Sequence, residues 1–307
     1  MVIDENRAFG ISIKIAELDL LLQAQDNQLQ LTSPPSYQKF LQPVDQPQAF
    51  FENGSSVNPQ KENSKLLLRV INETTIESLK SKSHLFGSDN WEIWIDENGS
   101  FFLEALRLAP ARRVSIEPGF SSGEVRGDFS EVDAGGYYPL QNLDMKIFVN
   151  WLAGFGDLIL HASGVVANGK GYCFSGPAGI GKSTLAAALQ KNHGVTILGE
   201  DQVILRYLDG LFWIFGTPWH ENPAMCSPLG MPLEKLFFLE RNADLVIEPL
   251  TAVDSVARML QNAFIPYYRQ DLLSGILDNL ELLTSQVPFF SLSYPLGVDP
   301  WQAILEA

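Results

Sequence analysis

The sequence predicts an α/β fold in the second half of the chain, preceded by a smaller β-rich domain. In residues 139–307, short apolar strands alternate with helical stretches, which is the pattern of an α/β domain. A glycine-rich loop at 176–184 joins one of these strands to a helix. Residues 65–126 instead consist of short strand patterns separated by turn residues. We therefore expect a β-rich domain at 1–138 and an α/β domain at 139–307.

The composition excludes several classes of partner. The chain has 307 residues, a formal net charge of −15 and a pI of about 4.6. A strongly acidic protein lacks the basic surface that binds nucleic acid or anionic membranes, so we expect neither partner. No basic leader and no apolar run of about 18 residues is apparent. With only two cysteines, Cys173 and Cys226, the sequence predicts a cytoplasmic protein.

The predicted β-rich domain contains few helical signals. A strand is expected at 9–15, and residues 26–64 are rich in Gln, Ser, Pro and Asn, which predicts loops with one short strand near Phe50 and Phe51. Asn98-Gly99 predicts a hairpin turn. The further predicted strands are 65–71, 91–95, 101–106, 114–117 and 124–126.

The predicted α/β domain begins after a break near Gly135 and Gly136. Apolar residues at helical spacing predict a first helix at 139–154. Asn168-Gly169 and Asp209-Gly210 predict tight turns between neighbouring strands. The predicted strands are 158–167, 172–174, 195–198, 202–207, 211–215, 236–239 and 289–294, and the later helices are 251–264 and 270–285.

The glycine-rich loop fits the phosphate-binding pattern G-x-x-x-x-G-K-[ST], also called Walker A. Glycines allow backbone N–H groups to converge on phosphate oxygens, and the following helix directs its positive dipole end at the same anion. Lys182 is expected to contact the outer phosphates and Ser183 to join a magnesium ion. The sequence therefore predicts ATP and Mg²⁺ as ligands. The residues expected to hold ATP are Gly176, Ala178, Gly179, Ile180, Gly181, Lys182, Ser183 and Thr184.

Two adjacent carboxylates follow the next predicted strand. Glu200 and Asp201 lie where the carboxyl end of that strand would approach the loop. One of them is expected to hold magnesium and the other to accept a proton from an attacking hydroxyl. An acidic surface turn is the alternative.

His161 precedes the loop on a strand that is predicted to form a hairpin with the strand entering it. If that hairpin turns at Asn168-Gly169, His161 lies at the loop end and can approach a bound γ-phosphate. A core histidine bonded to the backbone is an equal alternative.

Together, Leu160-His161-Ala-Ser163, Gly176–Thr184 and Gly199–Asp201 resemble the HPr kinase/phosphorylase group, whose nucleotide fold is shared more distantly by ATP-dependent phosphoenolpyruvate carboxykinase. The closest resemblance covers about residues 158–206. It implies a P-loop domain of that type, with an N-terminal β-rich domain, and ATP-dependent phosphoryl transfer to a hydroxyl. The acceptor would be a serine of a protein or peptide, or a small molecule.

The resemblance also implies roles for individual residues. Asp201 corresponds to the acid expected to act as base, and His161 to a histidine near the transferred phosphate, so the expected catalytic residues are Asp201, His161 and Lys182. Ser183, Glu200 and Asp201 are the expected magnesium ligands. Glu200 replaces the more usual aspartate.

Other interpretations stay open at this point. One alternative is a nucleotide-gated binding module without phosphoryl transfer. Another is a mechanical or transport ATPase, but this chain lacks the signature sequence of transport ATPases. The identity of the acceptor and a homo-oligomeric state are left open. His220-Glu221 could approach the site, but an exposed loop is the favoured interpretation. Three arginines either steer an acidic substrate or lie on a solvated strand edge: Arg107, Arg112 and Arg113. Arg258 and Arg269 either supply a cation to the transition state or lie on helix surfaces.

Overall fold

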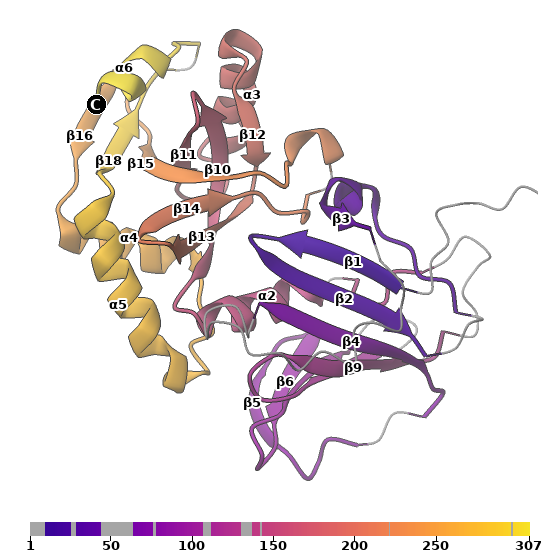
Figure 1. Cartoon of the computed structure of the whole chain (residues 1–307). Helices are drawn as coiled ribbons and strands as arrows, with labels where there is room; N and C mark the ends of the chain where they lie inside the picture. Colours follow the sequence, from indigo (N-terminus) through magenta and orange to yellow (C-terminus); the bar gives the residue numbers. More distant parts are fainter. Residues whose placement is uncertain are drawn as a thin grey trace, which may run out of the picture. The chain divides into compact units, whose positions relative to one another are not determined.

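The chain forms two compact units, Met1–Ile147 and Phe148–Ala307, in the computed structural model (Figure 1). They divide within helix α2 (Asp144–Ala153). The sequence places the boundary between 138 and 139. Its expected break at Gly135 and Gly136 lies outside the described residues. The structure describes residues 10–25, 29–43, 64–75, 78–106, 112–129, 137–141, 143–220, 222–295 and 297–307.

The first unit is built around one sheet with the strand order β3-β1-β2-β4-β9-β8-β7-β6-β5. Strands β2, β4 and β9 are parallel to one another, and the other neighbours are antiparallel. The strands are β1 (Gly10–Ile15), β2 (Leu18–Ala24), β3 (Leu41–Gln42), β4 (Lys65–Asn72), β5 (Ser83–Gly87), β6 (Trp91–Ile95), β7 (Phe101–Ala105), β8 (Arg112–Ile116) and β9 (Ser122–Gly127).

One face of this sheet forms the core of the first unit. Leu66, Leu68 and Val70 alternate along β4 and have no exposed surface, as expected for the inner face of a strand. The predicted hairpin is confirmed, since Ile95 pairs with Phe101 across the turn that contains Gly99. The order of the strands was not predicted.

Part of the segment predicted to be loop has regular structure. A 3-10 helix, η1 (Pro35–Phe40), buries Tyr37 and Phe40. The hydroxyl of Tyr37 donates to Asp144 at the start of α2, and Tyr138 donates to the same carboxylate. The prediction of loops was therefore wrong for this stretch, because Tyr37 and Phe40 are buried and hold it in a regular turn. The strand predicted near Phe50 and Phe51 lies outside the described residues.

The second unit contains a ring of strand pairings. Strand β10 pairs with β11 and β13, β13 with β14, β14 with β15, and β15 returns to β11 in parallel. Strands β18 and β16 continue beyond β15, while β12 and β17 pair with β10. The strands are β10 (Leu158–Ala167), β11 (Lys170–Ser175), β12 (Thr196–Gly199), β13 (Gln202–Leu208), β14 (Leu211–Phe215), β15 (Gly230–Glu240), β16 (Val246–Pro249), β17 (Ala263–Phe264) and β18 (Phe289–Ser293).

Helices cover the two faces of the parallel strands β11, β15 and β18. Alternate residues of β15 enter different clusters, because successive side chains of a strand point to opposite faces. Leu236 and Phe238 pack with α4 (Ala252–Asn262) and α5 (Gln270–Gln286), which lie side by side in Figure 1. Phe237 and Leu239 pack with α3 (Lys182–His193) and α6 (Trp301–Glu306). This arrangement explains why β15 is apolar on both faces.

Most predicted elements of the second unit are present, with shifted ends. Helix α2 starts at Asp144 rather than 139, because residues 139–141 form a turn. Strand β15 is much longer than predicted, and α6, η3 (Pro223–Met225) and β16 were not predicted. Among the described residues, no helix combines the length and apolar character needed to cross a membrane.

Candidate functional site

The glycine-rich loop connects β11 to α3, as its sequence predicts. Gly176, Gly179 and Gly181 have φ angles of 142°, 74° and 114°. These left-handed values strain any residue with a Cβ, so the loop needs glycine at all three positions. Residues 177–179 are exposed to solvent. The loop is therefore open to a ligand.

The start of α3 provides a site for an anion. Gly181 is the N-cap and has no side chain to satisfy the first helical N–H groups. The first helical bond runs from the N–H of Leu185 to the oxygen of Gly181 at 2.9 Å. The N–H groups of residues 182–184 precede it and lack helical acceptors, as at any helix start. Together with the helix dipole, they form a general phosphate-binding arrangement.

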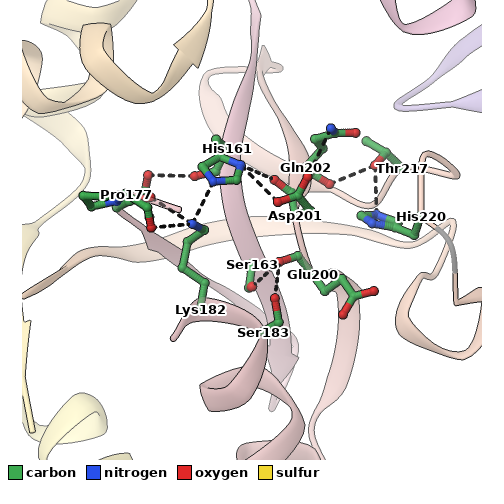
Figure 2. A network of polar contacts seen from close by, with 12 residues as sticks. His161, Ser163, Pro177, Lys182, Ser183, Glu200, Asp201, Gln202, Thr217 and His220 are labelled. Atoms are coloured by element: carbon green, nitrogen blue, oxygen red, sulfur yellow. Dashed lines mark hydrogen bonds and ion pairs between the residues drawn. The ribbon is translucent and has the colours of Figure 1, made fainter. Parts of the chain in front are cut away.

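Lys182 is buried, and three acceptors surround its ammonium group. Nζ donates to the main-chain oxygens of Gly176 at 2.9 Å and Pro177 at 3.1 Å. It also lies 2.9 Å from Nε2 of His161 (Figure 2). An ammonium group has three N–H donors, so all of them are used inside the protein. Burial lowers the pKa of Lys182.

His161 links Lys182 to Asp201. It lies on β10, whose antiparallel register pairs Ala162 with Ser175, so the imidazole lies at the loop end of the hairpin. Nδ1 is 3.1 Å from Oδ1 of Asp201 and also 3.1 Å from its main-chain oxygen. Because Nε2 accepts from Lys182, Nδ1 carries the proton of a neutral ring. The side chains of Asp201, His161 and Lys182 therefore form one continuous chain of contacts.

The Asp201 carboxylate is held at both oxygens. His161 contacts Oδ1, and Nε2 of Gln202 donates to Oδ2 at 3.3 Å. The hydrogen bond from His161 is the largest cause that lowers the pKa of Asp201, and the charge of Lys182 acts in the same direction. Half of the Asp201 side chain is still exposed. It is ionised at neutral pH and accessible to a ligand.

Glu200 contributes its main chain to the site. Its carbonyl oxygen accepts from Ser163 at 2.6 Å and from the loop residue Ser183 at 3.2 Å. Its carboxylate points away from Lys182 in Figure 2. The neighbouring side chains of Ser183 and Asp201 carry a hydroxyl and a carboxylate, the kinds of oxygen ligand that magnesium prefers.

The site offers few protein ligands for a metal ion. Within the described parts of the chain, no group of three or more His, Cys, Asp or Glu side chains could hold a metal ion. Nucleotide-bound magnesium is typically held by one or two protein oxygens, with phosphates and water as the remaining ligands. Ser183 and Asp201 fit that requirement.

One group near the site was not selected from the sequence, and a second was named but expected to be exposed. Nη2 of Arg241 lies 3.5 Å from the main-chain oxygen of Gly179 in the loop. Arg241 directly follows β15, which runs parallel to β11, so its strand ends beside the loop. A cation directly after a predicted apolar strand was the available signal.

The second group is the segment around His220. Thr217 bonds to Gln202, the residue after Asp201, and His220 contacts Thr217. The sequence favoured an exposed loop here, which was wrong for His220, because its side chain is partly buried. Glu221 lies outside the described residues.

The candidate arginines are engaged elsewhere. Arg258 pairs with Glu240 and Arg269 with Asp271, as surface arginines commonly do. Arg112 and Arg113 are only 1% and 8% exposed, so neither a substrate-steering role nor a solvated strand edge was correct. Burial lowers the pKa of Arg112 to about 10. Arg107 lies outside the described residues.

Comparison with known proteins gives little further information. No family model and no curated protein matches the chain. The Hpr(Ser) kinase/phosphatase from Coxiella burnetii is found among solved structures, with a TM-score of 0.26 and 13% identity, over 47% of this chain and 90% of that chain. A TM-score this low carries no argument, so a functional assignment depends on the residues described above.

Proposed function

We propose that this protein is an ATP-dependent kinase that transfers the γ-phosphate to a hydroxyl group, in a P-loop fold of the HPr kinase and phosphoenolpyruvate carboxykinase type. The observation that carries the proposal is the chain of contacts from Asp201 through His161 to Lys182. These residues lie on three separate segments and meet beside a phosphate-binding loop. The loop alone would support only nucleotide binding. A carboxylate and an imidazole beside its lysine supply the groups that phosphoryl transfer needs.

ATP binding would use the loop and its lysine. The N–H groups of residues 178–184 and the dipole of α3 favour the phosphates, and Lys182 adds a positive charge. Because the three donors of Lys182 are used within the protein, contact with phosphate requires the ammonium to exchange at least one acceptor. Ser183 would hold Mg²⁺ directly and Asp201 through a coordinated water, so that its carboxylate could still accept a proton; the ion would neutralise charge on the phosphates. Glu200 would contribute only after its side chain turns.

The transfer step needs a proton acceptor. The acceptor hydroxyl oxygen forms a bond to the γ-phosphorus, the bond from that phosphorus to the bridging oxygen breaks, and ADP leaves with the electron pair. The hydroxyl proton passes to the carboxylate of Asp201 as the new bond forms. His161 holds that carboxylate in place through Oδ1. Most of the acceleration in this class of reaction comes from positioning and charge stabilisation.

The experiment that tests this proposal is a search for a phosphorylated product. The protein is incubated with Mg-ATP and a panel of serine-containing peptides and small polyols, and products are identified by mass spectrometry and ³¹P NMR. A phosphoester product formed by the wild type and lost in the Asp201→Asn variant supports the proposal. Saturable ATP binding without any product would instead favour a nucleotide-gated binding module.

A further inference from the structure

A loop between β14 and β15 lies against the end of β12, directly before Glu200. The N–H of Ser227 donates to Leu198 at 3.0 Å, and the backbone of Gly216 packs against the oxygen of the same residue. A Cβ on Gly199 would lie 2.8 Å from Nε2 of His220. Glycine at 199 therefore allows the imidazole of His220 to approach the backbone that leads into Asp201.

Hydrogen-bond geometry fixes the tautomer of His220. The hydroxyl of Thr217 donates to the main-chain oxygen of Gln202 at 2.8 Å, and this uses its one proton. Nε2 of His220 lies 3.1 Å from the same hydroxyl oxygen. The only remaining way to form this bond is for Nε2–H to donate. In the neutral ring, Nδ1 then carries no proton and is an acceptor.

Among the residues that the structure describes, this acceptor has no donor. Nδ1 of His220 is buried and makes no hydrogen bond. Burial also lowers the pKa of His220 to about 4, so the ring is neutral at physiological pH, although Asp201 opposes the shift. Leaving a buried acceptor unpaired destabilises the folded protein, and native proteins rarely retain one without a reason. The His220 side chain as a whole is partly exposed, but the Nδ1 atom itself is buried, so a ligand at Asp201 reaches Nδ1 only if the side chain or its loop moves.

We propose that Nδ1 of His220 accepts a hydrogen bond from the phosphate acceptor, and so selects molecules that carry a second hydrogen-bond donor beside the hydroxyl to be phosphorylated. This inference rests on the proposed kinase function. The substrate class is then a vicinal polyol or a serine whose own amide N–H lies next to its hydroxyl. A site built to pair with such a donor rejects analogues that lack it, because the buried acceptor stays unpaired. His220 is thus a specificity residue, and Thr217 is the positioning residue that sets its tautomer.

The first test needs no acceptor molecule. Long-range ¹H–¹⁵N NMR of uniformly labelled protein distinguishes a protonated from an unprotonated ring nitrogen. We expect Nε2 of His220 to be protonated and Nδ1 to be unprotonated in the wild type. The same result is expected in Thr217→Ser, which keeps the hydroxyl. A proton on Nδ1 in the wild type would overturn the inference, whatever the protein catalyses.

The second test uses matched acceptors and variants. Each serine peptide that the enzyme phosphorylates is compared with the same peptide N-methylated at that serine. Likewise, 1,2-propanediol is compared with 1-methoxy-2-propanol, which lacks the second hydroxyl donor. His220→Gln keeps a donor towards Thr217 and removes the Nδ1 acceptor, and His193→Gln on the surface of α3 is the matched control. Melting temperatures of all variants are measured, and Thr217→Val serves as a second variant should His220→Gln not fold.

The outcomes separate this inference from the proposed function. The wild type should prefer the donor-bearing acceptor by about tenfold to hundredfold in kcat/KM, and His220→Gln should lose that preference while the KM for ATP stays unchanged. An unchanged preference in His220→Gln, or none in the wild type, overturns the inference alone. If no acceptor is phosphorylated, the proposed function fails and this inference falls with it.

Discussion

The ammonium group of Lys182, at the start of α3, lies 2.9 Å from Nε2 of His161, which is 21 positions earlier on β10. The loop lysine is therefore held by an imidazole as well as by its own loop. The same imidazole contacts Asp201 through its other nitrogen. One ring therefore contacts both the loop lysine and the carboxylate.

Replacing Lys182 should weaken nucleotide binding. In Lys182→Met the positive charge opposite the phosphates is lost, and hydrogen bonds to charged groups contribute about 1.5–3 kcal/mol each. We expect ATP to bind about tenfold to hundredfold more weakly in isothermal titration calorimetry. Lys191→Met, at the exposed end of the same helix, is the control and should bind like the wild type. Equal affinity in both variants would remove Lys182 from the site.

Replacing Asp201 should slow phosphoryl transfer without weakening the binding of ATP. Asp201→Asn keeps the shape of the side chain but cannot accept a proton, so kcat should fall by about 10²–10⁴-fold. The affinity for ATP without magnesium should change little. Asp209→Asn, in the exposed turn between β13 and β14, is the same substitution at a position where φ is 50° and asparagine is tolerated. Should Asp201→Asn retain full activity, another group must act as the base.

Removing His161 should change the pH dependence of Asp201. The hydrogen bond from His161 is the first cause of the lowered pKa, so His161→Phe should raise the pKa of Asp201. A carboxylate whose pKa is lowered by folding stabilises the folded protein at pH values above its unfolded pKa of 3.8. This stabilisation is lost as the pH falls through the folded-state pKa. In His161→Phe this loss occurs at higher pH. The measurement is ¹³C NMR of the Asp201 carboxyl during a pH titration.

The control for this titration is a second histidine–aspartate contact. His193 lies 2.7 Å from Asp299, away from the loop. His193→Phe should leave the titration of Asp201 unchanged. Identical curves for the wild type and His161→Phe would contradict the assignment of cause.

Two glycine substitutions should have opposite effects. A Cβ on Gly199 would meet the oxygen of Gln202 at 2.6 Å and His220 at 2.8 Å, so Gly199→Ala must displace backbone or ring. We expect a loss of roughly 1–3 kcal/mol in the free energy of unfolding. A Cβ on Gly275, inside α5, would have no neighbouring atom closer than 4.0 Å. Gly275→Ala should therefore stabilise the helix by about 0.5–1 kcal/mol. Urea denaturation curves of both variants measure these effects, and destabilisation by Gly275→Ala would show that the helix is tightly packed there.

A buried ion pair should dominate the stability of the second unit. Asp157 accepts from Nε of Arg206 at 2.7 Å and from the N–H of Tyr207 at 3.0 Å, and both charged side chains are at most 5% exposed. Asp157→Ala removes the carboxylate that faces the buried guanidinium of Arg206, and breaking such a buried pair costs about 3–5 kcal/mol. We expect a clear drop in the melting temperature by calorimetry. Glu234→Ala, which breaks the exposed contact with Lys170, should leave it nearly unchanged.

Local signals correctly predicted that His161 lies beside the loop. Asn168-Gly169 predicts a two-residue turn, and both residues adopt the positive φ angles that such a turn requires, 52° and 73°. That turn fixes the register of β10 and β11, and the register places His161 beside the loop. The prediction succeeded because every step depended on residues close together in the sequence.

Contacts between distant segments escaped prediction. Arg241 reaches the loop only because β15 pairs with β11 across more than 60 intervening positions, a choice of partner that apolar patterns do not specify. His220 was expected to be exposed because its loop is polar and rich in proline. Its burial depends on the loop packing against Leu198 and Gly199.

The sequence by itself determined the strand–loop–helix unit, its glycines, and the identity of the charged groups that surround it. These features depend on backbone conformation and turn chemistry, which are encoded over a few residues. Only the tertiary structure decided that Asp201, His161 and Lys182 form one chain of contacts, and that Nδ1 of His220 is left without a donor. The reason is that strand order and loop packing minimise the free energy of the whole unit, and no short segment carries that information.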